Sequence, residues 1–298
     1  MTKKTRNWLI ALCILVFPFV LFFGFMIFME EPLPPPASLP NPNGYDDLVK
    51  AGKMVKGDYW DYDKASLEKL HGIVLTNAEA LALARNALSN QCGVPLQFTK
   101  AYLTNHIQDL IAFRGLAQAL VCEGRLAEKE NRFNEAAKTY ADAIHLGNEV
   151  AQGGLLVDAM LGIAIQSLGL AQLQTLATNL DAHSCRETIA TLETLTTQRQ
   201  SWAEIVRQEN AWSRRTFGLR GQIMKVLYYS RREKNSQRAI DTIKSTEKKQ
   251  GQLVIDLAAR ACELEMGKPP VGISDLVPEY LKAVPQDPTT GTNMVLSR

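Results

Sequence analysis

The side chains that most often carry out catalysis are scattered along this sequence. Four histidines, His71, His106, His145 and His183, lie far apart, and none belongs to the His-Glu-x-x-His spacing that binds zinc from one helix face. There is no Gly-x-x-x-x-Gly-Lys phosphate loop, no Gly-x-Gly-x-x-Gly turn and no Gly-x-Ser-x-Gly nucleophile elbow. Because these motifs are absent, the sequence predicts no catalytic residue, no cofactor and no metal ion. They favour a protein that is not an enzyme, without deciding the question.

Paired carboxylates could still act as a general acid and base if folding brought them together. Asp46 and Asp47 are neighbours, and neighbouring side chains point to different faces, so we interpret them as solvated charge. Glu204 and Glu209 fall on one expected helix and could line a groove, but nearby arginines favour salt bridges. An enzyme acting on a cell-envelope polymer would need two carboxylates about 5–9.5 Å apart in a deep cleft.

Four cysteines, Cys92, Cys122, Cys185 and Cys262, lie after the N-terminal apolar run described below. In an oxidising compartment, four cysteines permit three patterns of two disulfides. The alternative is that they are small buried residues, since Cys122 and Cys262 have apolar neighbours in expected helices. The sequence leaves both interpretations open.

The feature that restricts the biology most is an uncharged run of 22 residues, Trp8–Met29. A helix rises about 1.5 Å per residue, so the run is about 33 Å long and can cross a bilayer core of about 30 Å. Pro18 lies in its middle, where a membrane helix tolerates a kink. A cleaved signal peptide would be shorter, a lipoprotein would need a small residue before Cys13, and a buried core helix suits so many phenylalanines less well. We therefore predict a transmembrane helix within residues 1–30.

Flanking charges predict the orientation of this helix. Lys3, Lys4 and Arg6 precede the run, and Glu30 and Glu31 follow it. Positively charged flanks tend to stay in the cytoplasm. We therefore predict a single-pass membrane protein with a cytoplasmic N-terminus and an extracytoplasmic, periplasmic domain. The opposite topology is the alternative, because several lysines follow soon after residue 44.

Residues 31–44 contain six prolines and are predicted to be a linker. Proline fixes φ and disfavours helix, so the segment should be extended and semi-rigid. At about 3.1 Å per residue it could hold the following domain up to about 43 Å from the membrane. A passive stalk is the favoured interpretation, and a docking site for a proline-binding module is the alternative.

Charge excludes one class of partner. The chain has 33 Lys and Arg against 31 Asp and Glu, and without the three cations before the apolar run the numbers are 30 and 31. A domain so close to neutral has no general attraction for nucleic acid. The basic cluster at 231–238 is interpreted as a solvated helix end or turn.

Residues 45–298 are predicted to form an all-α domain. Apolar residues recur at helical spacing from Thr76 onward, and no run alternates as a strand would. Three segments match the capping box that starts a helix, Thr76–Glu79, Ser184–Glu187 and Ser201–Glu204. Before them, residues 45–75 are predicted to be irregular apart from one short helix at 64–70.

The most specific pattern resembles one tetratricopeptide repeat unit at about residues 117–150. Gly124 occupies the small position of the first helix, and Ala136, Tyr140 and Ala143 match the small, aromatic, small triplet of the second. Small residues let two antiparallel helices approach closely, and the aromatic ring fills the gap beside the next unit. Since no second repeat can be aligned, neighbouring helices must complete the stack. The resemblance implies a helical bundle or a solenoid-like domain.

Residues 153–169 form a second apolar segment. Asp158 and Gln166 interrupt it, and it is short for a membrane span, so a buried central helix is predicted instead. Gly162 weakens a helix by about 1 kcal/mol relative to alanine. Close contact with another helix is the expected compensation.

Residues 269–298 are predicted to be an irregular tail. Leu276–Leu281 and Val284–Pro288 resemble the tails of uncharacterised bacterial single-pass membrane-anchored helical proteins, a resemblance that implies no known activity. Proline prevents a long helix here, and Tyr280 and Leu281 are expected to pack the tail onto the helices.

Together these features predict a membrane-tethered helical scaffold or adaptor on the extracytoplasmic side of the membrane. Its expected partners are the lipid bilayer, through the N-terminal helix, and a protein or peptide held by the helical domain. One alternative is the enzyme on a cell-envelope polymer described above. Another is an envelope protein that self-associates through its span. A helical-repeat architecture supports the first function only by association.

Overall fold

The computed structural model describes residues 38–57, 64–227 and 229–296, together with residues 5, 8, 12, 14–21 and 24. Side chains are described in these ranges except between 219 and 233. The chain divides into two compact units, Met1–Pro36 and Ala37–Arg298. We call the second unit the body.

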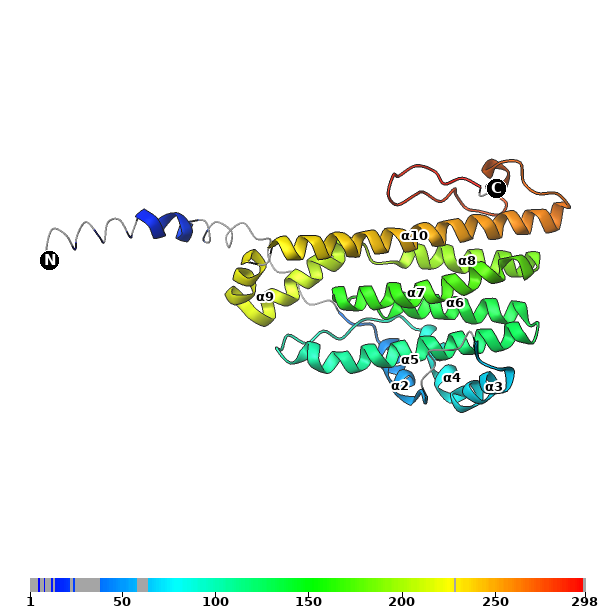
Figure 1. The fold of residues 1–298 in the computed structure, drawn as a ribbon, viewed down its shortest axis with the longest axis horizontal. Helices are drawn as coiled ribbons and strands as arrows, with labels where there is room; N and C mark the ends of the chain where they lie inside the picture. Colours follow the sequence, from blue (N-terminus) through cyan, green and yellow to red (C-terminus); the bar gives the residue numbers. More distant parts are fainter. Residues whose placement is uncertain are drawn as a thin grey trace. The chain divides into compact units, whose positions relative to one another are not determined.

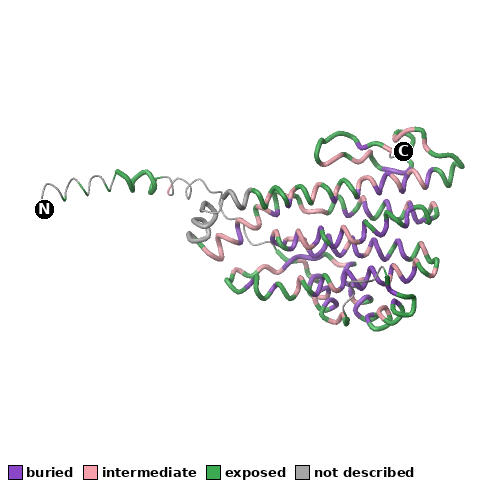
Figure 2. The backbone as a smooth tube through the Cα atoms, in the orientation of Figure 1, coloured by how far each residue is buried: buried purple, intermediate pink, exposed green. Residues whose placement is uncertain are grey.

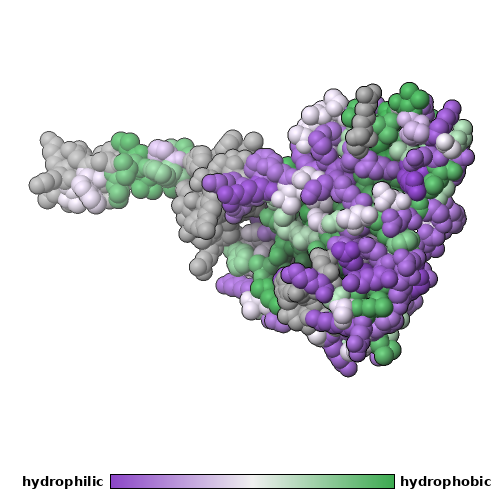
Figure 3. All heavy atoms as spheres, turned by 45° about the vertical axis from the view of Figure 1, so that its right-hand side comes forward, coloured by the Kyte–Doolittle hydropathy of each residue, from purple (hydrophilic) through white to green (hydrophobic). Residues whose placement is uncertain are grey.

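In the first unit, residues 14–21 are helical, and the helix continues through Pro18. Its large apolar side chains are exposed, since Trp8 is 68% exposed and Phe17 is 62% exposed. Figure 3 shows this segment as hydrophobic, whereas hydrophilic residues cover much of the visible face of the body. Met29 and residues 31–37 of the Pro-rich segment lie outside the described residues.

The body is built of helices (Figure 1). Over the ranges given above, the backbone forms no strand, and one isolated bridge joins Gln286 to Asn293. The all-α fold class predicted from the sequence is confirmed. The α-helices are α2 (Gly44–Met54), α3 (Leu67–Thr76), α4 (Ala78–Leu88), α5 (Tyr102–Lys129), α6 (Phe133–Glu149), α7 (Leu156–Leu176), α8 (Ala182–Gln198), α9 (Trp202–Leu227) and α10 (Tyr229–Met266).

The long helices lie side by side in layers (Figure 1). α10 packs on α8. The next layers are α7 and α6, and α5 lies beyond them against the short helices α2 and α3. One hydrophobic cluster is centred on α2 to α5, another is centred on α8, α10 and the C-terminal tail, and α5, α6 and α7 contribute to both. Figure 2 shows that the buried residues concentrate on these inner helices.

One of the three predicted capping boxes is present. The Ser201 hydroxyl accepts from the Glu204 N–H at 3.3 Å, and the Glu204 carboxylate accepts from the Ser201 N–H at 2.8 Å, so α9 starts as predicted. The box at Thr76 is wrong, because Thr76 ends α3 and its hydroxyl donates to a carbonyl of that helix at 2.7 Å. The box at Ser184 is also wrong, because Asp181 accepts from the Ser184 N–H at 2.7 Å and caps α8 earlier.

The stretch before Thr76 is more helical than predicted. α2 covers residues that were expected to be irregular. The Asn43 side chain accepts from the Tyr45 N–H, and Tyr45 and Leu48 recur at helical spacing on the buried face. α3 is the short helix that was expected at 64–70, but it starts later because Ser66 caps it.

The end of the Pro-rich linker belongs to the body. Residues 38–43 are not helical, as expected, but they pack against the loop after α4. Asn43 Nδ2 donates to Gly93 O at 2.9 Å, and the Gly93 N–H donates to Asn43 Oδ1 at the same distance. Residues 38–43 therefore have partners in the body, and the 31–44 boundaries of the linker stay a prediction.

The pair α5 and α6 is the unit that resembles a tetratricopeptide repeat. Tyr140 of α6 is fully buried, and its ring lies so close to Gly124 of α5 that a Cβ there would overlap it. Ala136 and Ala143 are fully buried on the same helix as Tyr140. These small residues allow the two helices to approach closely. Membership of the wider family stays a prediction.

α7 is the apolar helix for which membrane insertion was the alternative. Among the described residues, Leu156–Asn179 is the one helix long and apolar enough to cross a membrane, and it packs against α6, α5 and α10. Gly147 of α6 and Gly162 of α7 meet so closely that a Cβ on either would overlap the carbonyl oxygen of the other. The predicted buried helix and the close contact at Gly162 are both confirmed.

The tail, residues 267–296, contains a 3-10 turn at Ile273–Leu276 and is otherwise irregular. Tyr280 and Leu281 are both buried and join the hydrophobic cluster of α8 and α10. The expected packing of the tail is confirmed.

The four cysteines of the body, Cys92, Cys122, Cys185 and Cys262, are buried and form no disulfide. Burial raises the pKa of Cys122 and of Cys185 to about 11. Their interpretation as small buried residues is confirmed.

Candidate functional site

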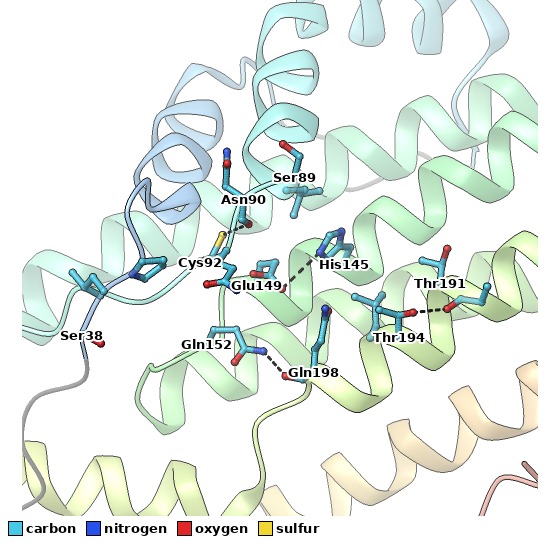
Figure 4. A pocket seen from close by; sticks show the side chains of 16 residues that line it. Ser38, Ser89, Asn90, Cys92, His145, Glu149, Gln152, Thr191, Thr194 and Gln198 are labelled. Atoms are coloured by element: carbon cyan, nitrogen blue, oxygen red, sulfur yellow. Dashed lines mark hydrogen bonds and ion pairs between the residues drawn. The ribbon is translucent and has the colours of Figure 1, made fainter. Parts of the chain in front are cut away.

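Two cavities of similar size lie in the described part of the body, and α8 contributes to both. We call the first, with a volume of about 870 Å³, the polar cleft (Figure 4). It is formed by the linker end, the loop after α4, the last turn of α6 and the outer face of α8. Its lining residues are Ser38, Leu39, Pro40, Leu88, Ser89, Asn90, Gln91, Cys92, His145, Glu149, Gln152, Ala190, Thr191, Thr194, Leu195 and Gln198.

Glu149 is the charged centre of the polar cleft (Figure 4). The residue is 7% exposed, and its Oε1 accepts from Asn148 Nδ2 at 3.3 Å and lies 3.7 Å from His145 Nε2. His145 lies one helical turn earlier on α6, so the helix places the imidazole beside the carboxylate. Cys92, from the loop after α4, lines the same cleft, and its thiol donates to the Asn90 carbonyl oxygen at 3.8 Å (Figure 4).

This group does not match an activated cysteine nucleophile. Burial first, and then the negative charge and hydrogen bonding of Glu149, raise the pKa of the Cys92 thiol. A nucleophilic cysteine needs a lowered pKa, because the thiolate is the reactive form. The arrangement therefore favours ligand recognition by the carboxylate over covalent catalysis by the thiol.

We call the second cavity, with a volume of about 900 Å³, the apolar groove. It lies between the end of α8, the start of α9, the middle of α10 and the tail. Its lining residues with apolar side chains are Trp202, Ile240, Ile243, Val254, Ala283, Val284, Pro285 and Pro288. Its charged lining residues are Glu193, Arg199, Lys244, Glu247 and Lys282.

Arg199, directly after α8, fixes one wall of the groove. Its Nη2 donates to Gln166 Oε1 at 2.7 Å and to Gln250 Oε1 at 2.6 Å, and its Nη1 lies 3.3 Å from Glu247 Oε1. Desolvation lowers the pKa of Arg199, and Glu247 opposes this change. The guanidinium therefore ties α7, α8 and α10 together at this wall.

The tail forms the other wall and is held by polar contacts. The Lys282 N–H donates to Glu193 Oε1 at 3.2 Å, and Lys248 Nζ lies 2.7 Å from Asp287 Oδ2. The Lys248 ammonium, followed by backbone donors, lowers the pKa of Asp287 to about 2. α8 and α10 thus hold an irregular, proline-containing chain segment along the groove.

The residues predicted for repeat packing, Gly124, Ala136, Tyr140 and Ala143, line neither cavity. They lie inside the α5–α6 pair, where they fix the helix that carries His145 and Glu149. Their contribution to a site is therefore indirect.

Glu209, which was considered as a groove residue or a salt-bridge partner, lines neither the polar cleft nor the apolar groove. Its Oε2 accepts from the Leu156 N–H at 3.0 Å, at the start of α7. A free backbone donor at the helix start therefore takes part of the carboxylate's hydrogen-bonding capacity, and the salt bridge with an arginine stays a prediction.

Sequence reasoning missed a buried pair between α5 and α7. His106 Nε2 lies 2.5 Å from Asp158 Oδ1, and the two side chains are 4% and 0% exposed. Asp158 Oδ2 also accepts from the Leu155 N–H at 2.7 Å. The two residues are 52 positions apart, so no local spacing pointed to the pair. Its burial makes it a structural link between helices.

Among the described residues, no group of three or more His, Cys, Asp or Glu side chains could hold a metal ion. No family model, curated protein or solved structure matches this chain. The chemistry of the two cavities is therefore the basis for assigning a function.

Proposed function

We propose that this protein is a membrane-tethered helical scaffold or adaptor that holds an extended peptide segment of a partner protein in the apolar groove. The N-terminal apolar helix anchors it in the bilayer, with the N-terminus in the cytoplasm. The Pro-rich residues act as a stalk, and the body lies on the extracytoplasmic side. Support for the anchor comes from the uncharged run Trp8–Met29 and from the exposure of its described apolar side chains, such as Phe17.

The apolar groove is the observation that carries the proposal. Its volume of about 900 Å³ falls within the range of ligand sites, which is about 300–1,000 Å³. Trp202 and Ile243 offer apolar surface on facing helices, and Pro285 closes the side formed by the tail. Burying apolar groups there stabilises a complex by about 0.8 kcal/mol for each CH₂ removed from water.

Two features favour a peptide as the occupant. α8 and α10 already hold one non-helical, proline-containing segment, in which the Lys282 backbone N–H donates to Glu193. Lys244 lines the groove and is half-buried, and it has no ion-pair partner among the described residues. An apolar peptide with one acidic side chain would complement both the walls and this cation.

A peptide-display selection on the full-length protein in lipid nanodiscs tests the groove. We expect apolar peptides with an acidic residue to be enriched, and fluorescence anisotropy to show at least tenfold weaker binding to Ile243→Asp. Leu75→Asp is the matched control, because Leu75 is an 81% exposed leucine on α3 that lines neither cavity. Enriched peptides that bind Ile243→Asp as tightly as the native protein would overturn the proposal.

Fractionation tests the anchor separately. After gentle lysis without detergent, the full-length protein should sediment with membranes and resist extraction by alkaline carbonate. Recovery of the intact chain in the soluble fraction would contradict the proposed tether.

A further inference from the structure

The polar cleft has a chemistry that the proposed function does not use. Its described lining contains no lysine and no arginine, and Glu149 is the carboxylate in that lining. The cleft therefore offers nothing to neutralise a phosphate or a carboxylate ligand. A negative charge in a cavity without cations instead attracts a positive group.

The charge of Glu149 is incompletely compensated. It is 7% exposed, its Oε1 accepts from the Asn148 amide at 3.3 Å, and the His145 imidazole lies 3.7 Å away. A buried carboxylate is costly unless it is paired with a cation or fully hydrogen-bonded. A cationic ligand in the cleft would supply the missing partner.

The hydroxyl groups of the cleft are also oriented to accept. Ser89, Thr191 and Thr194 each donate their hydroxyl hydrogen to a backbone carbonyl of their own segment, at 2.7, 3.0 and 2.8 Å. A hydroxyl has a single hydrogen, so these three oxygens have only lone pairs left for a ligand. The lining therefore offers three hydroxyl acceptors in addition to the carboxylate.

We infer that the polar cleft binds a ligand with a primary ammonium group on an otherwise neutral molecule that carries hydroxyl or amide groups, and that Glu149 pairs with the ammonium. An ammonium has three donors and no acceptor, which complements a lining that holds a carboxylate and hydroxyl oxygens able to accept. The neutral part of the ligand fits beside Gln152 and Gln198, whose amides can both donate and accept. A volume of about 870 Å³ has room for more than a bare ion. The amine of an amino sugar and that of a peptide share this chemistry.

Isothermal titration of the full-length protein in nanodiscs, with two pairs of probes, tests the inference. The first pair is glucosamine and N-acetylglucosamine, and the second is Nα-acetyl-lysine amide and its Nε-acetylated form. We expect at least one free amine to bind ten or more times as tightly as its acetylated counterpart. The pair that shows the larger preference for the free amine identifies the ligand as an amino sugar or a peptide. Equal binding, or no binding, of amines and acetylated forms overturns the inference.

Variants locate the site. Glu149→Gln should abolish the preference for the amine, whereas the control Glu187→Gln, at an exposed glutamate of α8 outside the cleft, should keep it. Thr191→Val changes an exposed cleft residue and should weaken amine binding several-fold even if Glu149→Gln does not fold. A preference for the amine that survives both Glu149→Gln and Thr191→Val contradicts the assignment. So does Zn²⁺ binding that is lost in both Glu149→Gln and Cys92→Ser, because it would make the cleft a metal site.

Discussion

The polar cleft and the apolar groove have nearly the same volume but opposite chemistry. Hydroxyls, amides and one carboxylate surround the cleft, whereas Trp202, Ile243 and other apolar side chains surround the groove. Both use α8, and Thr194 lines both of them. Successive residues of a helix point to different faces, so one helix separates two environments. The apolar surface of the groove comes from α9, α10 and the tail, because the α8 residues that line it are polar.

The two cavities also differ in how they are built. The cleft is formed mainly by helix ends that the α5–α6 and α6–α7 contacts hold in place. The groove has the irregular tail as one wall, and this wall depends on ion pairs such as Lys248 with Asp287. We therefore expect core substitutions to affect both cavities, and substitutions in one cavity or in the tail to affect one alone.

Substitution at the α6–α7 contact should have the largest effect. Gly162→Ala places a Cβ against the carbonyl oxygen of Gly147, so the free energy of unfolding should fall by about 1–3 kcal/mol. Gly72→Ala is the control, because nothing lies within 4 Å of a Cβ there and the unfolding free energy should rise by about 0.5–1 kcal/mol. Urea unfolding followed by circular dichroism measures both. Equal stability of Gly162→Ala and the native protein would mean that the helices do not meet as described.

Truncation of an apolar side chain in the groove should weaken the binding of the peptide but not that of the amine. Trp202→Ala removes the largest apolar lining group, and the affinity for the selected peptide should fall by about 30-fold, equivalent to about 2 kcal/mol. Amine binding in the cleft should stay within twofold of the native value. Anisotropy and titration calorimetry measure the two affinities, and a parallel loss of both would show that the cavities are not independent.

Glu149→Gln should stabilise the protein while it removes amine binding. The substitution replaces a buried, incompletely paired charge by a neutral group of the same shape, so the unfolding free energy should rise by about 1 kcal/mol. Peptide binding in the groove should be unchanged. Thermal unfolding without ligand measures the effect, and a marked loss of stability would show that Glu149 is a structural residue.

Acid should loosen the tail, because it protonates Asp287, which pairs with Lys248 of α10. The folded-state pKa of Asp287 is lowered from 3.8 to about 2, so its contribution is complete above the unfolded value and is lost as the pH falls towards 2. Pepsin should therefore cut the tail faster at pH 2 than at pH 4. Asp287→Asn should be cut rapidly at both values. If the native protein and Asp287→Asn were cut at the same rate at pH 4, Lys248 would not hold the tail.

Much of the fold could be predicted because its signals are local. Helical spacing gave the all-α class, Gly162 pointed to a close helix contact, and Tyr280 and Leu281 pointed to a packed tail. The helix starts at Thr76 and Ser184 were wrong for a local reason as well. Asp181 caps α8 ahead of Ser184, whereas Thr76 still belongs to α3, and α4 starts after Asn77 without a side-chain cap, so a motif alone does not show where a helix starts.

The candidate site could not be predicted, because packing assembles it from distant segments. Cys92 and Glu149 lie on different elements, and Thr191 comes from a third. The single-residue signals that exist, a glutamate and a histidine one turn apart on α6, are common on any exposed helix. Only the burial of Glu149 and the lack of a cation in the lining set this pair apart, and both depend on the tertiary structure.

Site-specific photocrosslinking of a selected peptide in membranes would separate the two cavities most clearly. A benzophenone amino acid is placed at position 243 of the full-length protein in the groove, or at position 191 in the cleft, and a biotin-labelled peptide whose amines are acetylated is added before irradiation. We predict a crosslink from position 243 and none from position 191. A crosslink from position 191, or equal crosslinks from both, would contradict the assignment of the groove as the peptide site.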